Sequence, residues 1–130
     1  MSQAKILVVD DDLDNRLIIR AALQVSDFDV CEAADGLEAL DVVAKEMPDL
    51  ILLDLSMPRL NGWEVARRLK GNPAFSNIPI FAFTAHAMAG DEKKAREAGC
   101  DDYVTKPCIP REVVAKIKLH LQGRKEGRHA

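Results

Sequence analysis

Short apolar runs alternate along the chain with longer segments in which apolar residues have a helical period. Five runs are rich in β-branched or aliphatic residues, as is typical of strands, and they cover residues 6–9, 29–33, 50–53, 78–83 and 103–104. The first, third and fourth runs are continuously apolar. This indicates strands that are covered on both faces of a sheet.

Between these runs, apolar residues recur every three or four positions, which predicts amphipathic helices. The predicted inward faces are Leu17, Ile18, Ala21, Ala22 and Val25; Leu37, Leu40, Ala44 and Met47; Val65 and Leu69; and Val113, Ile117 and Leu121. The segment from about 88 to 98 has mostly alanine at its apolar positions. It can bury little area, so we expect it to be the loosest helix.

Residues typical of helix ends support these assignments. Two pairs have the spacing of capping boxes, namely Asp35 with Glu38 and Asn61 with Glu64. Gly71 and Gly99 are expected to close helices in the left-handed conformation, and Pro110 suits a first helical turn.

Strand and helix alternate five times, which predicts an α/β fold: a doubly wound, five-stranded parallel sheet with helices on both faces. The sequence contains no internal repeat, low-complexity tract or linker. We therefore expect one domain over residues 1–122, followed by a short polar tail over residues 123–130, with no output domain.

Composition narrows the function. The chain has 130 residues, 48% hydrophobic and 30% charged, as is ordinary for a soluble globular domain. A net charge of −3 argues mildly against nucleic acid as the direct partner. No apolar stretch approaches the ~20 residues that span a membrane, and the first apolar run is too short for a signal peptide. We expect a cytoplasmic protein that makes no membrane contact.

The three cysteines, Cys31, Cys100 and Cys108, form neither an even set nor a metal-spaced pair. We interpret them as small, mostly buried thiols. Trp63 is interpreted as a packing residue, and nothing in the sequence explains Cys108.

Polar residues occur where four of the predicted strands end. The first is followed by Asp10, Asp11 and Asp12, the third by Asp54, the fourth by Thr84 and, within two residues, the fifth by Lys106. Because the carboxyl ends of parallel strands share one edge, these groups should converge. Clustered carboxylates repel one another unless a cation is present, and two or three hard oxygen ligands favour Mg²⁺.

Any one of these acids alone is better interpreted as a solvated turn residue, a helix cap or a strand-ending acid. Their joint placement at matching strand ends favours a functional site. A nucleotide- or flavin-binding sheet would instead have glycine, serine or threonine after its first strand, where backbone amides hold a phosphate. The three acids found there would repel one.

At these positions the chain resembles the receiver domain of two-component response regulators. The motifs are Val8-Val9-Asp10-Asp11, Leu53-Asp54 with Met57-Pro58 and Asn61-Gly62, Thr84-Ala85, and Tyr103 ahead of Lys106-Pro107. The resemblance covers residues 5 to 121 and is closest to the single-domain members, which relay phosphoryl groups or regulate partner proteins. It implies the flavodoxin-like strand order 2-1-3-4-5 with five helices.

The resemblance also implies the chemistry. Asp54 would accept a phosphoryl group from a phosphohistidine on a sensor histidine kinase or a histidine phosphotransfer protein. Asp11, Asp54 and the main-chain carbonyl of Ser56 would bind Mg²⁺, with Mn²⁺ as an alternative, and Asp10 would act through a water. The chain would then be a signalling phosphoacceptor that assists its own phosphorylation and dephosphorylation.

Other positions take roles by the same resemblance. Lys106 and Thr84 would contact phosphate oxygens, and the Lys106-Pro107 bond would be cis. Thr84 and Tyr103 would transmit the signal to a downstream protein target. Ser56 and His86 would tune how readily water attacks the acyl phosphate; His86 is either a titratable gate near neutral pH or an exposed loop histidine.

Two competing functions fit less well. A Mg²⁺-dependent phosphohydrolase would be expected to carry a second acid two residues after Asp54, and Ser56 stands there. A DNA-binding regulator would need a second, basic helical domain. That hypothesis therefore holds only if these 130 residues are part of a longer gene product.

Overall fold

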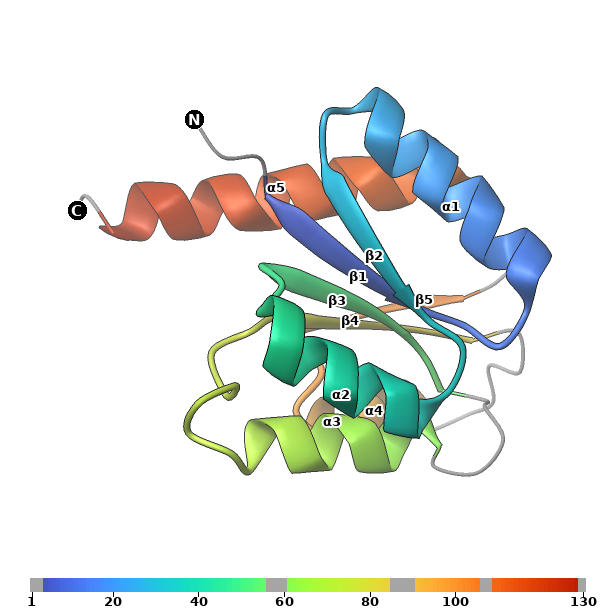
Figure 1. Ribbon diagram of the computed structural model, residues 1–130. Helices are drawn as coiled ribbons and strands as arrows, with labels where there is room; N and C mark the ends of the chain where they lie inside the picture. The colour runs from blue at the N-terminus through green and yellow to red at the C-terminus, as the bar shows by residue number, and fades with distance from the viewer. Residues whose placement is uncertain (1–3, 56–60, 85–90, 106–108, 129–130) are drawn as a thin grey trace.

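The computed structural model describes residues 4–55, 61–84, 91–105 and 109–128 (Figure 1). Five strands and five helices alternate in this part of the chain. They are β1 (Lys5–Val9), α1 (Leu13–Val25), β2 (Asp29–Ala33), α2 (Gly36–Glu46), β3 (Leu50–Asp54), α3 (Gly62–Lys70), β4 (Ile80–Thr84), α4 (Asp91–Glu97), β5 (Asp102–Thr105) and α5 (Pro110–Arg128).

The strands form one parallel sheet in the order β2-β1-β3-β4-β5, which confirms the predicted fold class. The central strands β3 and β4 are buried along their whole length, as their continuous apolar runs predicted. The edge strand β2 is less buried, and Ala33 at its end is its one fully buried residue.

The helices lie in two layers, with α1 and α5 on one face of the sheet and α2, α3 and α4 on the other (Figure 1). Because successive strand residues point to opposite faces, β1 contributes to both cores. Ile6 and Val8 pack in the α1–α5 layer, while Leu7 and Val9 pack under α2 and α3.

The inward face predicted for α1 is largely wrong, although Ala22 packs partly buried against the core. Leu17, Ile18 and Val25 are 46%, 55% and 84% exposed, and Ile19 and Leu23 are the buried residues. Most positions from 17 to 25 are apolar, so periodicity alone supports two overlapping faces. The structure buries Ile19 and Leu23 where α1 lies against β1 and β2, and it leaves an apolar face in solvent.

The face predicted for α2 is also shifted. Ala39 and Val43 are fully buried with Gly36, whereas Leu37 and Met47 are about half exposed. Small residues let this helix approach the sheet closely, and that outweighs the larger side chains on the adjoining face. The faces predicted for α3 and α5 are confirmed: Val65, Leu69, Val113 and Ile117 are buried, and Leu121 packs partly buried against the same core.

The predicted helix starts are confirmed in their main contacts. The side chain of Asp35 accepts from the amide of Glu38 at 2.9 Å, and that of Asn61 accepts from the amide of Glu64 at 3.0 Å. The Glu38 carboxylate, however, accepts from the amide of Ala34 at 3.2 Å, one residue before the position of a standard capping box.

Of the two predicted helix ends, one is confirmed and the other is wrong. Gly99 has φ 105° and closes α4 in the left-handed region, as expected. Gly71 has φ −80° and stays right-handed, so that prediction was wrong. The reason is that the chain continues from Gly71 into a further turn, in which the amide of Asn72 donates to the carbonyl of Leu69 at 3.2 Å.

Helix α5 begins at Pro110 as predicted and continues to Arg128, so much of the segment expected as a polar tail is helical (Figure 1).

Within the parts of the chain that the structure describes, none of the helices combines the length and apolar composition that a bilayer-spanning helix needs.

Candidate functional site

Three buried polar residues lie at the carboxyl edge of the sheet, at the ends of neighbouring strands. Asp10 directly follows β1, Asp54 ends β3 and Thr84 ends β4, and they are 1%, 4% and 2% exposed. Val9 pairs in register with Leu53 and Asp54 with Phe83, so the three positions are adjacent along one edge. The sheet therefore brings these predicted groups to one place.

The carboxylates of Asp10, Asp11 and Asp54 form a compact group that could hold a metal ion. One oxygen from each lies within 4.8 Å of the others, and Asp11 is the exposed member. Three hard oxygen donors, one of them open to solvent, fit a cation such as Mg²⁺ that keeps part of its water shell. The donor set therefore fits the metal that the sequence predicted.

The three consecutive acids after β1 have different roles. Asp12 is the N-cap of α1, because its side chain accepts from the amides of Asp14 at 2.9 Å and Asn15 at 3.3 Å. Its own amide donates to Oδ1 of Asp10 at 2.9 Å, which fixes one oxygen of that carboxylate. Of these three acids, Asp10 and Asp11 belong to the carboxylate group that could hold a metal ion.

Helix α3 begins directly against the main chain of Asp54. A Cβ on Gly62 would lie 2.5 Å from the carbonyl oxygen of Asp54 and 2.7 Å from Cα of Leu55. The amide of Gly62 donates to the carbonyl of Leu55 at 3.2 Å, and the amide of Leu55 to that of Phe83 at 3.1 Å. The close packing of α3 against the main chain of Asp54 thus requires a glycine at position 62.

Several predicted site residues lie outside the described residues. They are Ser56, His86, Lys106 and Pro107 with its predicted cis bond; Cys108, which has no predicted role, also lies outside the described residues. Thr105, which precedes Lys106 in the sequence, ends β5 in register with Thr84. The roles of the site residues that lie outside the described ranges stay predictions from the sequence.

The contact of Arg16 on α1 with Asp10 was not predicted from the sequence. Nη1 of Arg16 donates to the main-chain carbonyl of Asp10 at 2.6 Å, and its Nε donates to Glu32 on β2 at 3.2 Å. The available signal was its spacing: Arg16 lies one helical turn after the N-cap Asp12, and helical side chains point back toward the N-terminus.

Burial raises the pKa of both described cysteines. The pKa of the Cys100 thiol is raised to about 12, first by burial and then by the nearby Asp101, and burial also raises the pKa of Cys31. A raised pKa keeps a thiol protonated and unreactive near neutral pH. These two residues are packing thiols, as the sequence predicted.

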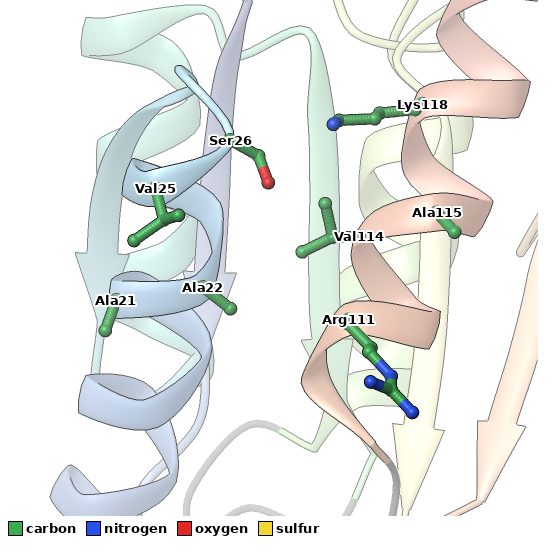
Figure 2. A pocket seen from close by; sticks show the side chains of 8 residues that line it. All are labelled: Ala21, Ala22, Val25, Ser26, Arg111, Val114, Ala115 and Lys118. Carbon is green, nitrogen blue, oxygen red and sulfur yellow. The ribbon is translucent and has the colours of Figure 1, made fainter.

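A groove lies between α1 and α5 (Figure 2). It has a volume of about 500 Å³ and is lined by Ala21, Ala22, Val25, Ser26, Arg111, Val114, Ala115 and Lys118. Its lining contains none of the predicted site residues.

Comparison with known proteins identifies the family. The sequence model of a protein family, the response regulator receiver domain, matches residues 6–118 of this chain. The chain belongs to this family. Receiver domains are signalling switches of two-component systems that accept phosphoryl groups and interact in general with histidine kinases and downstream targets, and this receiver domain shares that broad role.

Relatives agree in sequence and in structure. The receiver domain is 36% identical to the polar-differentiation response regulator DivK of Brucella anthropi, over 89% of this chain and 94% of DivK. It is 41% identical to the probable transcriptional regulator ycf27 of Porphyridium aerugineum, over 94% of this chain but only half of that relative. A CheY-like receiver domain from Methanospirillum hungatei superposes with a TM-score of 0.90 at 27% identity, covering 97% of this chain and 99% of that one.

Proposed function

We propose that Asp54 accepts a phosphoryl group from a phosphohistidine on a partner protein in a Mg²⁺-dependent reaction, and that phosphorylation changes affinity for a downstream protein. The observation that carries the proposal is the buried Asp54 carboxylate at the end of β3, grouped with those of Asp10 and Asp11. Neither nucleic acid nor a membrane is a direct partner in this proposal.

In the transfer step, a carboxylate oxygen of Asp54 forms a bond to phosphorus while the bond from phosphorus to the histidine nitrogen breaks. The imidazole leaves with the electron pair, and the product is an acyl phosphate on Asp54. The protein contributes chiefly by fixing the nucleophile and by stabilising charge on the transferred oxygens. The burial of Asp54 and the close approach of Gly62 to its main chain supply the first of these.

Asp11, Asp54 and the main-chain carbonyl of Ser56 would hold Mg²⁺, or Mn²⁺ in its place, with Asp10 acting through a water. The bound cation would neutralise charge on the phosphoryl oxygens. The hydroxyl of Thr84 and the ammonium of Lys106 are assigned to the remaining phosphate oxygens. Ser56 and His86 are assigned to tuning how long the phosphoryl group persists.

The exposed apolar face of α1 gives a place for the phosphoryl donor to dock. Leu13, Leu17 and Ile18 are 55%, 46% and 55% exposed, and α1 starts directly after the acidic turn. A contiguous exposed apolar patch beside a reactive group is typical of a protein-binding surface. We therefore assign the N-terminal half of α1 to donor contact.

Incubation with Mg²⁺ and a small acyl-phosphate donor should add one phosphoryl group to the wild type and none to Asp54→Ala. Intact-mass analysis with peptide mapping measures this. Asp12→Asn is the matched control, because asparagine also caps a helix and Asp12 lies outside the carboxylate group. Equal labelling of wild type and Asp54→Ala would contradict the assignment of the acceptor.

Metal binding has its own test. Mg²⁺ should raise the melting temperature of the wild type and of Asp12→Asn, but much less that of Asp11→Asn. Without Mg²⁺, Asp10→Asn should melt above the wild type, because it removes one of three mutually repelling carboxylates. If Mg²⁺ stabilises Asp11→Asn as much as the wild type, Asp11 is not a ligand.

A further inference from the structure

Arg16 links the carboxylate group to the edge of the sheet. Its side chain is only 14% exposed although it carries a full charge. One part of the guanidinium donates to the main-chain carbonyl of Asp10 at 2.6 Å, and another donates to Glu32 on β2 at 3.2 Å. Glu32 also accepts from Arg20 at 2.8 Å, so it is held from two sides.

Together these contacts hold Asp10 at three atoms. Its amide donates to the carbonyl of Ala33 at 3.2 Å, its carbonyl accepts from Arg16, and its Oδ1 accepts from the amide of Asp12 at 2.9 Å. The two main-chain contacts both lead to β2, directly at Ala33 and through Arg16 to Glu32. The main chain of Asp10 is therefore held against the edge strand, and its carboxylate is held by the amide of Asp12.

We propose that Arg16 is a positioning residue for the Mg²⁺ site: it fixes the main chain of Asp10 so that the carboxylates of Asp10 and Asp11 are aimed before the ion arrives. This inference rests on the proposed function. Arg16 itself does not contact the ion. The guanidinium suits the role because its planar fork can bind a carbonyl and a carboxylate at once, which a lysine ammonium cannot do in the same geometry.

Positioning and simple charge make opposite predictions for Mg²⁺ affinity. A cation beside three carboxylates opposes the binding of a second cation, so if Arg16 acted only through its charge, removing it would tighten Mg²⁺ binding. If Arg16 positions Asp10, removing it loosens the ligands and weakens binding. Groups that orient metal ligands typically change affinity by about 10- to 100-fold when they are removed.

The test is a Mg²⁺ titration of the unphosphorylated protein, followed by the amide chemical shifts of the β1–α1 turn, which also report whether each variant is folded. Arg16→Met keeps much of the length and apolar volume of the side chain and should bind Mg²⁺ about 10-fold more weakly than the wild type. Arg16→Lys, which keeps the charge but not the fork, should lie between the two. Arg20→Met is the matched control, because Arg20 contacts Glu32 but has no hydrogen bond to Asp10 among the described contacts; it should bind within about twofold of the wild type.

Four results would overturn the inference. If Arg16→Met binds Mg²⁺ more tightly than the wild type, Arg16 acts through its charge, and if it binds equally tightly, Arg16 does not position the ligands. Arg20→Met must not weaken binding as much as Arg16→Met, since that shows a general loss of the ion-pair network. If Arg16→Met fails to fold, Arg16→Lys decides alone, and wild-type affinity in that variant contradicts positioning. A wild type that shows no Mg²⁺ binding refutes the proposed metal site itself, and the inference with it.

Discussion

Helices α3 and α4 cover the same face of the sheet, but they are held in different ways. Helix α3 buries Val65, Ala66 and Leu69 and packs its first residue, Gly62, against the main chain of Asp54. Within α4, Ala95 is the fully buried side chain among those described. A buried valine or leucine contributes about 1.5–3 kcal/mol and a single methyl group about 0.8 kcal/mol, so α3 is much the more firmly anchored.

The described polar contacts of α4 do not make up the difference. Lys94 lies 4.9 Å from the ring centre of Trp63, and Arg96 pairs with Glu92 at 3.3 Å and with Asp102 at 3.8 Å. Most of these charged side chains are substantially exposed, where each contact contributes about 1 kcal/mol or less. The helix beside the proposed phosphoacceptor is thus fixed by packing, while the helix after β4 is held mainly at its surface and is the better placed to move.

Removing a large side chain from α3 should have the largest effect on stability. Leu69→Ala should lower the free energy of unfolding by about 3 kcal/mol, because Leu69 is 2% exposed in a close-packed core. Ala95→Gly on α4 should lower it by about 1 kcal/mol, chiefly through helix propensity. Urea denaturation measures both. Equal losses in the two variants would show that α4 is anchored as firmly as α3.

A methyl group at the start of α3 should disturb Asp54 itself. Gly62→Ala places a Cβ against the Asp54 carbonyl and should cost about 2–3 kcal/mol as overpacking, with slower acyl-phosphate labelling of Asp54. Gly71→Ala is the control, since Gly71 has φ −80° and the nearest atom to its Cβ would be 3.2 Å away. If Gly62→Ala matches Gly71→Ala in both stability and labelling rate, α3 does not fix the acceptor.

We expect the signal of phosphorylation to pass through the region of β4 and α4, which is less firmly packed than α3. We predict that phosphorylation changes partner affinity about tenfold in the wild type, equivalent to about 1.4 kcal/mol, and that Thr84→Ala and Tyr103→Ala reduce this ratio. Thr84 is buried at the end of β4, and Tyr103 packs against the core shared with α2, α3 and α4. Tyr103→Ala should still be labelled at Asp54, and Tyr103→Phe, which keeps the ring, should retain most of the ratio. If both alanine variants keep the wild-type ratio, the signal leaves by another route.

The sequence predicted the sheet and the carboxylates well, and for one reason. Both follow from short-range patterns: continuous apolar runs mark buried strands such as β3 and β4, and the acids after residues 9 and 53 lie at strand ends that a parallel sheet must bring together. The small apolar area that α4 buries could likewise be predicted, because Ala95 is the one apolar residue from Asp91 to Glu97 and an alanine has little area to bury.

What the sequence did not predict depends on contacts between distant segments. Ile19 and Leu23, not the equally apolar Leu17 and Ile18, face the sheet, because the choice is made by how α1 lies on β1 and β2. The contact of Arg16 with Asp10 depends in the same way on where β2 places Glu32. Periodicity has no information about either.

The smallest predicted effect is a pH dependence confined to the end of α4. Cys100 closes the chain segment after α4, with its amide donating to the carbonyl of Ala95 at 3.0 Å, and its thiol is buried. Burial raises the pKa of Cys100 from an ordinary value of 9.0 to about 12 in the folded protein. The unfolded chain therefore loses this proton at lower pH than the folded chain does, so the contribution to stability is complete below pH 9 and is lost as the pH rises toward 12.

At pH 10 the loss attributable to this group should be about 1 kcal/mol. Other groups titrate in the same range, so the quantity to measure is the difference between wild type and Cys100→Ala in urea unfolding at pH 8 and at pH 10. The wild type should lose more stability than the variant over this interval, because only the wild type carries the buried thiol. Cys31→Ala is a second reference, since Cys31 is only partly buried and should show a smaller difference. Parallel losses in the wild type and Cys100→Ala would mean that the thiol becomes accessible at little cost, and that the end of α4 is looser still than its packing indicates.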